Sequence, residues 1–157
     1  MEKKTKVTAS PGGYEIVIER TFATTPEKLW RAYTEPEIFA KWQGPDNLET
    51  IIKDWEMKPG GKWSYVAKGP DGSEYGFHGV THELVPAERS VQTFEYEGTP
   101  GHVAMNTAYF TREGDATKVR VVSVFQSPED RDGMIAAGME GGMNEGYARL
   151  DEIVKSL

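Results

Sequence analysis

The residues of this chain best suited to chemistry include two histidines four positions apart, His78 and His82. On a helix this spacing would suit a metal ion, but the flanking residues predict a strand, in which four residues span about 13 Å. Two imidazole rings that far apart cannot both bind one ion at about 2 Å. The pair therefore predicts no metal site, and each histidine alone is a candidate for either a pocket wall or an ordinary sheet position.

Acid–base chemistry would need an ionisable group inside a cavity. The carboxylates that lie nearest to apolar residues are Asp54, Glu83, Glu95 and Glu140, and most carboxylates of a soluble protein are solvated. The sequence contains no Gly-x-Ser-x-Gly elbow, phosphate loop, dinucleotide fingerprint or His-Glu-x-x-His motif. We therefore assign no catalytic residue and no cofactor. An enzyme that uses one of these carboxylates or histidines stays open as an alternative to a binding protein.

The aromatic residues are more informative. They occur in helix-like and strand-like segments, and two pairs share one strand face, Trp63 with Tyr65 and Tyr75 with Phe77. Core packing is the ordinary role of such residues. The alternative is that some of them line an apolar cavity and turn a polar edge toward it, as in many ligand sites.

Glycines interrupt the last helical segment. Gly138, Gly142 and Gly146 lie at i, i+4 and i+8, next to a stripe that contains Met139 and Met143. Each glycine inside a helix costs about 1 kcal/mol relative to alanine, so several of them need a structural reason. The ridge predicts either the close approach of another backbone or a cavity wall beside adaptable methionines.

The candidate ligand contacts combine these features. Most of them carry a bulky side chain on a predicted strand or early helix, or belong to the glycine and methionine face of the last helix. They are Trp42, Trp55, Trp63, Tyr65, Phe77, His78, Met105, Tyr109, Gly138, Met139, Gly142, Met143 and Tyr147. We expect them to surround an apolar or aromatic small molecule.

The elements that would position these residues follow from hydrophobic periodicity. After a predicted flexible tail over residues 1–12, an alternating strand starts at Tyr14, and Thr25-Pro26 opens a short helix. Pro36 interrupts that helix, and a second short helix ends at Gly44-Pro45. Turn signals rich in Gly and Pro then separate six predicted strands, at 48–57, 61–68, 73–85, 90–97, 102–112 and 116–125.

The end of the chain reads as one long helix. It starts at the N-cap Ser127, and its apolar residues recur three and four positions apart as far as Leu157. A single helix with one apolar stripe must cover one face of a sheet. The sequence therefore predicts one α+β domain over residues 13–157, with a curved antiparallel sheet of about six or seven strands. Bulky residues on both faces of 73–85 leave open which of its faces points into the cavity.

Composition narrows the set of partners. The chain has 157 residues, of which 18 are basic and 25 acidic, so its net charge is −7. This charge disfavours nucleic acids and anionic membrane surfaces. The absence of cysteine excludes disulfides, thiolate catalysis and cysteine-bound zinc. No signal peptide or run of about 18 apolar residues is present, so we expect a cytoplasmic protein without a membrane span, as a monomer or weak dimer.

Several segments resemble a known family. They comprise RTFATTPEKLWRAYTEP at 20–36, KWQGP at 41–45, DWEMKPGGKW at 54–63, GPDG at 69–72, GV at 79–80 and VPAER at 85–89. In order and spacing they resemble the activator-of-Hsp90-ATPase-like family of the START/Bet v 1-like superfamily, from about residue 14 to the end. The resemblance implies a helix-grip fold, with the C-terminal helix across the concave face of the sheet.

The resemblance also implies a cavity for an apolar small molecule, such as a lipid or polyketide-like compound. The matching motifs are structural, so the resemblance supplies no catalytic residue. The family often has Trp near a Gly-Trp pattern in the last helix, where this chain has Gly138-Met139 and Gly142-Met143, which predicts a more pliable cavity. A chaperone or stress-response partner is the alternative role, although this chain has no room for the additional N-terminal domain of the related eukaryotic co-chaperone. A cyclase-like or hydrolase-like enzyme is the third possibility.

Overall fold

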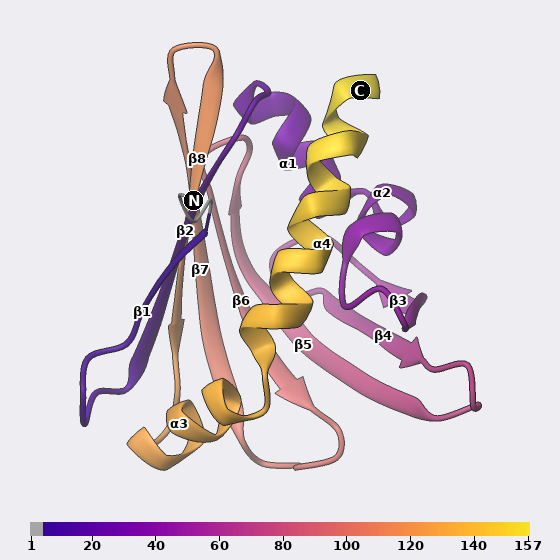
Figure 1. Ribbon diagram of the computed structural model, residues 1–157, viewed down its shortest axis with the longest axis vertical. Coiled ribbons are helices and arrows are strands. Elements are labelled where there is room, and N and C mark those ends of the chain that lie inside the picture. Colours follow the sequence, from indigo (N-terminus) through magenta and orange to yellow (C-terminus); the bar gives the residue numbers. More distant parts are fainter. Residues whose placement is uncertain (1–4) are drawn as a thin grey trace.

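The computed structural model describes residues 5–157 and contains an eight-stranded antiparallel sheet. The strands lie side by side in the order β1-β2-β8-β7-β6-β5-β4-β3, so β3 to β8 form a meander that β2 closes beside β8 (Figure 1). Their bounds are β1 Thr5–Thr8, β2 Glu15–Phe22, β3 Glu49–Trp55, β4 Lys62–Lys68, β5 Glu74–Val85, β6 Arg89–Tyr96, β7 Val103–Glu113 and β8 Ala116–Val124.

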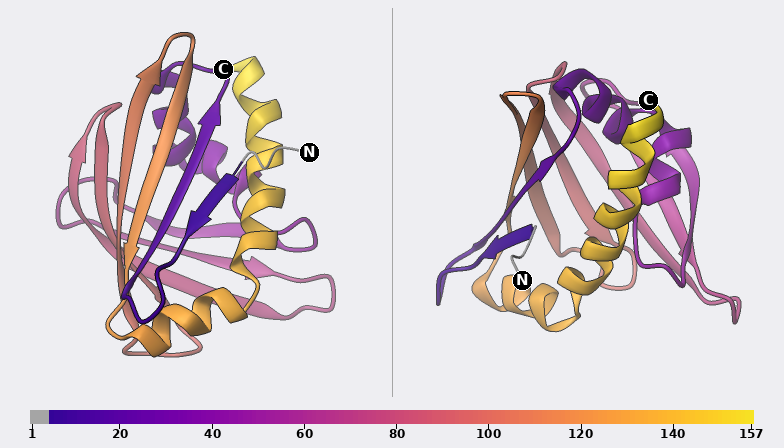
Figure 2. Two further views of the ribbon diagram at one scale, coloured as in Figure 1. Left: turned by 60° about the vertical axis from the view of Figure 1, so that its left-hand side comes forward. Right: turned by 45° about the horizontal axis from the view of Figure 1, so that its top comes forward.

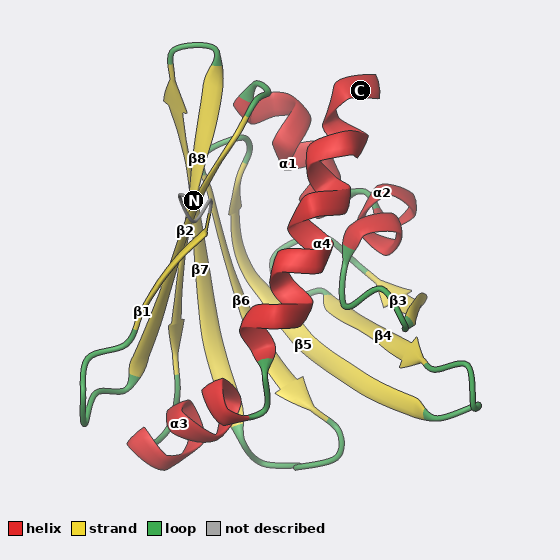
Figure 3. Cartoon of the chain, in the orientation of Figure 1, coloured by secondary structure: helices red, strands yellow, loops and turns green. Residues whose placement is uncertain are grey.

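Helices occupy two places in the chain (Figure 3). Between β2 and β3 lie α1 (Pro26–Thr34) and α2 (Pro36–Trp42), and after β8 follow α3 (Pro128–Ala136), α4 (Met139–Ile153) and a short 3-10 turn at Val154–Ser156. The side chains of Thr25 and Ser127 cap α1 and α3 by accepting hydrogen bonds from backbone N–H groups, as expected for these residues at N-caps. Figure 2 shows α1, α2 and α4 on the same side of the sheet.

The predicted α+β architecture, with an antiparallel sheet and a C-terminal helix, is confirmed, but the strand count is wrong. The sheet has eight strands rather than six or seven. The additional strand, β1, lies within the predicted tail of residues 1–12, of which residues 1–4 are outside the described part of the chain. Thr5 pairs with Arg20 and Thr8 with Val17, across a turn in which Gly12 has a φ of 74°. Four residues are too few for a clear alternation, so the sequence gives this strand little signal.

The predicted single C-terminal helix is also wrong, because the structure has two helices. Gly138 adopts a φ of 83°, a left-handed conformation that glycine takes without steric cost. Its N–H donates to the carbonyl of Ile135, and the chain then turns from α3 into α4 (Figure 1). As a result, Ile135 is exposed instead of joining the apolar stripe that α4 turns toward the sheet.

The register assigns the paired strand residues to one of two faces, because side chains alternate along a strand. We call the face that packs against α1, α2 and α4 the helix face, and the opposite one the outer face. The main core lies between the helix face of β2, β7 and β8 and these helices. It consists of Ile16, Ile18, Phe22, Leu29, Ala32, Ile38, Trp42, Ala108, Phe110, Val119, Tyr147, Leu150 and Val154.

A buried ion pair fixes α4 to β2. Arg20 is only 5% exposed, and its Nη2 donates to Asp151 Oδ2 at 2.5 Å. The guanidinium also lies 5.1 Å from the ring centre of Phe22 and 5.3 Å from that of Tyr147. Burial raises the pKa of the Tyr147 phenol, which therefore stays neutral near pH 7.

The glycine ridge of α4 packs against the end of α2. A Cβ at Gly146 would lie 2.5 Å from the Trp42 carbonyl oxygen, and one at Gly142 would lie 3.4 Å from the Pro45 ring. Arg149 reinforces this junction by donating to the Trp42 carbonyl at 3.0 Å. Of the two explanations that the sequence allows for the ridge, close backbone approach therefore accounts for Gly146, and the partner is the α2–β3 loop.

Candidate ligand-binding site

The helix face of β4, β5 and β6 carries a layer of five aromatic rings, which we call the aromatic floor: Trp63, Tyr65, Phe77, Phe94 and Tyr96. Trp63 stacks on Tyr65 and on Phe94, with ring centres 5.7 and 6.0 Å apart. Phe77 lies 5.2 Å from Tyr65, 5.5 Å from Phe94 and 5.3 Å from Tyr96. The register places these residues together, because Tyr65 pairs with Phe77 and Phe77 with Tyr96.

Further aromatic rings connect the floor to the helices. Phe39 of α2 lies 5.6 Å from Tyr65 and 5.0 Å from Trp55. Trp42 then contacts both Phe39 and Tyr147 of α4, at 5.4 and 6.0 Å. A continuous series of rings therefore runs from the sheet to the C-terminal helix.

Side chains on the helix face are almost fully buried at one end of the sheet and only partly buried at the other. In β2 and β8, Ile16, Phe22 and Val119 are each only 1% exposed. On the same face of β5 and β6, Phe77 and Phe94 are half-buried although they are large and apolar. This difference means that the part of the aromatic floor on β5 and β6 is accessible from the helix side.

A row of polar residues crosses the helix face beside the aromatic floor. Thr81 pairs with Gln92, Gln92 with Asn106, and Asn106 with Ser123, so four adjacent strands each contribute one residue. Gln92 donates to Thr81 Oγ1 at 3.0 Å, and Thr81 is fully buried. The half-buried amide of Asn106 makes no hydrogen bond with any residue of the described chain. The sequence does not reveal this row, because only the register aligns its members.

The indole N–H of Trp63 is a buried donor without a partner among residues 5–157. Two other tryptophans behave differently: Trp42 donates to the Ala32 carbonyl at 2.8 Å and Trp55 to the Thr34 carbonyl at 2.7 Å. Buried polar groups are nearly always hydrogen-bonded, so a donor without a partner at the edge of an aromatic layer marks a place where a ligand atom would be stabilised.

The predicted contacts on the C-terminal helices take different positions. Met139 and Met143 are half-buried against the core, and Tyr147 is buried with its ring 5.3 Å from that of Phe22. Gly142 lies against the α2–β3 loop, and Gly138 is an exposed residue at the break between α3 and α4. The methionines and Tyr147 are therefore the members of this group that face the core and the helix side of the sheet.

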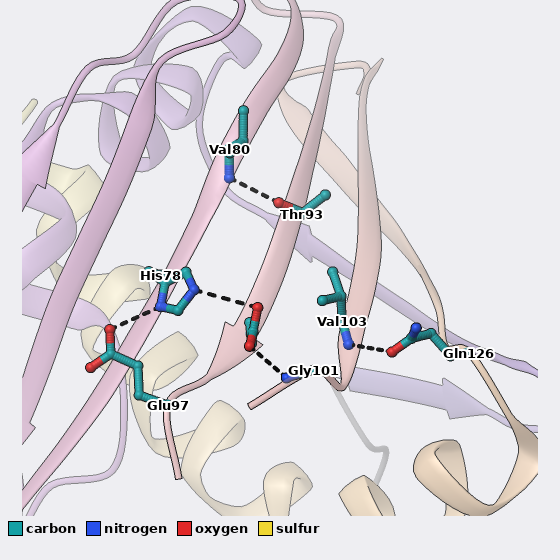
Figure 4. A network of polar contacts seen from close by, with 8 residues as sticks. His78, Val80, Thr93, Glu97, Gly101, Val103 and Gln126 are labelled. Atoms are coloured by element: carbon teal, nitrogen blue, oxygen red, sulfur yellow. Dashed lines mark hydrogen bonds and ion pairs between the residues drawn. The ribbon is translucent and has the colours of Figure 1, made fainter. Parts of the chain in front are cut away.

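Three predicted contacts lie on the outer face instead. Met105 is 48% exposed and Tyr109 38% exposed, on the side of β7 opposite to Ala104 and Ala108. His78 is held between two carboxylates, with Nδ1 2.8 Å from Glu97 and Nε2 3.4 Å from Glu95 (Figure 4). Because Phe77 faces the helices, the next residue must face away, which settles the parity of β5 that the sequence leaves open.

The predicted acid–base candidates do not gather at the aromatic floor. Asp54 accepts a hydrogen bond from Ser64 at 2.6 Å, and this bond lowers the pKa of Asp54. Glu83 pairs with Arg89 at the surface, and His82 is exposed. Within residues 5–157, no group of three or more His, Asp or Glu side chains could hold a metal ion.

Two surface clefts lie apart from the aromatic floor. One, of about 740 Å³, lies between α4 and the α2–β3 loop and is lined by Lys41, Asp46 and Arg149 among others. The other, of about 840 Å³, lies between α4 and the β2–β8 edge and includes Arg20 and Asp151. Neither cleft is lined by residues of the aromatic floor or of the polar row, and both contain charged pairs that hold α4 in place.

Comparison with known proteins places the chain among helix-grip domains. Residues 23–155 match the family model described as "Activator of Hsp90 ATPase homolog 1-like protein". A protein from Rhodobacter sphaeroides is 27% identical and superimposes with a TM-score of 0.89, over 98% of this chain and 99% of that one.

Two more distant structures share the fold. A protein from Arthrobacter aurescens is 22% identical, with a TM-score of 0.87 over 97% of this chain and 92% of that one. Protein Ms6760 from Mycobacterium smegmatis is 21% identical, with a TM-score of 0.85 over 94% of each chain. No curated protein matches the sequence. Along residues 5–157, no helix is both long and apolar enough to span a membrane.

Proposed function

The chain belongs to the Activator of Hsp90 ATPase homolog 1-like family of the START/Bet v 1-like superfamily, and from this premise we propose that it binds an apolar, ring-containing small molecule between its sheet and its C-terminal helices. The binding surface is the aromatic floor. Met139 and Met143 of α4 adapt to the opposite side of the ligand, since methionine side chains fit irregular partners.

The single observation that carries this proposal is the incomplete burial of the aromatic floor on β5 and β6. Phe77, Phe94 and Tyr96 face the same side as the main core, yet they are half-buried where Phe22 and Ile16 are sealed. Burying the remaining apolar surface stabilises a complex by about 25 cal/mol per Å². Aromatic rings in stacked and edge contacts also favour flat ligands.

The proposal predicts that substitutions on the two faces of the sheet have different effects on binding. Phe94→Leu removes a ring from the aromatic floor and should weaken the binding of fused-ring ligands roughly fivefold to tenfold. Tyr109→Leu is the matched control, because it removes a ring from the outer face and should leave affinity unchanged. Titration of a panel of fatty acids and fused-ring aromatic compounds, followed by intrinsic tryptophan fluorescence, measures both.

The outcome that would contradict the proposal is equally specific. If Tyr109→Leu weakens binding as much as Phe94→Leu does, the ligand does not occupy the helix face. If no compound of the panel binds the unmodified protein, the binding function itself fails.

A protein-interaction role is the second candidate, and the outer face favours it. Met105 and Val124 are paired across β7 and β8, and both are exposed, at 48% and 41%. Exposed apolar residues that cluster on a sheet can form a partner surface. A pull-down with Hsp90 tests this role: Met105→Glu should abolish capture, and the same capture by the substituted protein would count against it.

A further inference from the structure

We propose that the ligand of this site is a neutral compound with a carbonyl-type acceptor, to which the Trp63 indole N–H donates a hydrogen bond. The inference rests on the proposed function and adds two properties that the aromatic floor alone does not require: an acceptor atom and the absence of charge.

The first observation is that Trp63 cannot satisfy its donor within the described chain. The side chain is 7% exposed, and Nε1 has neither solvent contact nor a hydrogen-bond partner in residues 5–157. Two other indoles, those of Trp42 and Trp55, donate to backbone carbonyls of α1. An acceptor brought by a ligand would supply the missing bond.

The Trp63 ring is held in place, so an acceptor reaches its N–H only when the side chains that cover the indole edge move aside. Trp63 stacks between Tyr65 and Phe94 and lies over Gly79. A Cβ at Gly79 would lie 2.7 Å from the Trp63 ring and 1.9 Å from the Thr93 carbonyl oxygen. Only glycine therefore fits under this tryptophan, and the indole edge has a fixed position beside the floor.

The polar row gives a second anchor for an oxygen-bearing ligand. The Asn106 amide, which has no partner in the described chain, can both donate and accept. It lies on the same face as Phe94, one strand away, since Gln92 pairs with Asn106 and Phe94 with Ala104. A flat ligand on the floor can therefore place polar atoms toward β7 while its rings contact Phe77 and Phe94.

The charge of the surroundings favours a neutral acceptor over a carboxylate. On β4, β5 and β6, the register places no Lys or Arg on the helix face of the described strands. The cations that β2 and β7 place on this face, Arg20 and Arg112, are already paired with Asp151 and Glu27. An anion on the floor would have no cation to offset its desolvation, whereas a ketone, quinone or ester loses little on leaving water.

The test uses three probes with one ring system: fluorene, 9-fluorenone and fluorene-9-carboxylate. Affinities come from NMR titration of protein labelled with ¹⁵N at the tryptophan indoles. We expect 9-fluorenone to bind at least tenfold more tightly than fluorene and than the carboxylate, and to move the Trp63 indole proton downfield. The Trp42 and Trp55 indole signals are internal controls and should stay in place.

Trp63→Phe keeps an aromatic ring but removes the donor. In this variant, the ratio of the 9-fluorenone and fluorene affinities should fall to about one, even if the smaller ring weakens the binding of both, provided that the amide spectrum shows a folded protein. The titration of the unmodified protein does not depend on the variant. If fluorene and 9-fluorenone bind equally, or the carboxylate binds best, the inference is overturned while the proposed function stands. If none of the probes and no other fused-ring compound binds, both are overturned.

Discussion

Single side chains fix the distance between α4 and the sheet. Arg20 of β2 is buried and charged, and its pairing with Asp151 attaches the last helix directly to the strand beside the N-terminal edge. A buried cation that loses its partner is strongly destabilising, because its desolvation is no longer offset. The position of α4 over the sheet therefore depends on this pair.

Replacement of Asp151 by alanine should lower the free energy of unfolding by about 2 kcal/mol, less than for a fully buried pair because Asp151 retains some exposure. Glu152→Ala is the matched control on the next residue. It removes an exposed pair with Lys155 and should change stability by less than about 0.5 kcal/mol. Urea unfolding of the two variants measures the difference, and equal losses would show that the Arg20 pair does not hold the helix.

For single side chains, the sequence predicts which residue types contribute to the site better than it predicts the face of the sheet on which each side chain lies. Trp42, Trp55, Trp63, Tyr65, Phe77 and Tyr147 join one connected series of rings, but His78, Met105 and Tyr109 lie on the outer face. The direction of a strand side chain depends on register, and β5 contains an irregularity between Thr81 and Glu83 that local alternation cannot locate. The Trp63 N–H without a partner and the polar row likewise cannot be predicted from the sequence, because both depend on how the strands pair and pack.

Two glycines of the last helical segment determine where the helix breaks and how closely it packs. Gly138 breaks the segment, and Gly146 allows α4 to approach the carbonyl of Trp42. Two other glycines, Gly133 and Gly141, would place a Cβ in open space. The contacts therefore explain why glycine is needed at some positions of this segment. They do not explain why it occurs at the others, where it lowers the helix propensity.

The two kinds of glycine should respond oppositely to alanine. Gly146→Ala forces a methyl group against the Trp42 carbonyl and should cost about 1–3 kcal/mol. Gly141→Ala meets no neighbour within 4 Å and should stabilise the protein by up to about 1 kcal/mol through its higher helix propensity. Thermal or urea unfolding of both variants tests this, and stabilisation by Gly146→Ala would mean that α4 does not pack closely on the α2–β3 loop.

Most elements are predictable from the sequence, whereas their breaks and short additions are not. The six strands from β3 to β8 and the helices α1 and α2 agree with the turn, cap and proline residues around them. The helix break at Gly138 cannot be predicted from the sequence, because glycine occurs both inside closely packed helices and in left-handed turns. The strand β1 is hidden because its stability comes from pairing with β2 rather than from its own pattern.

For the molecule as a whole, the packing is asymmetric. Helices α1 and α4 pack against the helix face of β2, β7 and β8, while the part of the aromatic floor on β5 and β6 is less completely buried. The sealed half supplies the core of the fold, and in the other half Phe77, Phe94 and Tyr96 keep part of their apolar surface exposed. This division is the basis of the proposed binding function.

Amide-resolved NMR of the whole protein, titrated with a fused-ring ketone such as 9-fluorenone, tests this account most directly. A ligand on the aromatic floor should produce amide shifts that concentrate on Trp63, Phe77 and Phe94 and on the segment 139–147, with the smallest effects at Tyr109. Shifts confined to the outer face, or to the cleft that contains Lys41 and Arg149, would contradict the account.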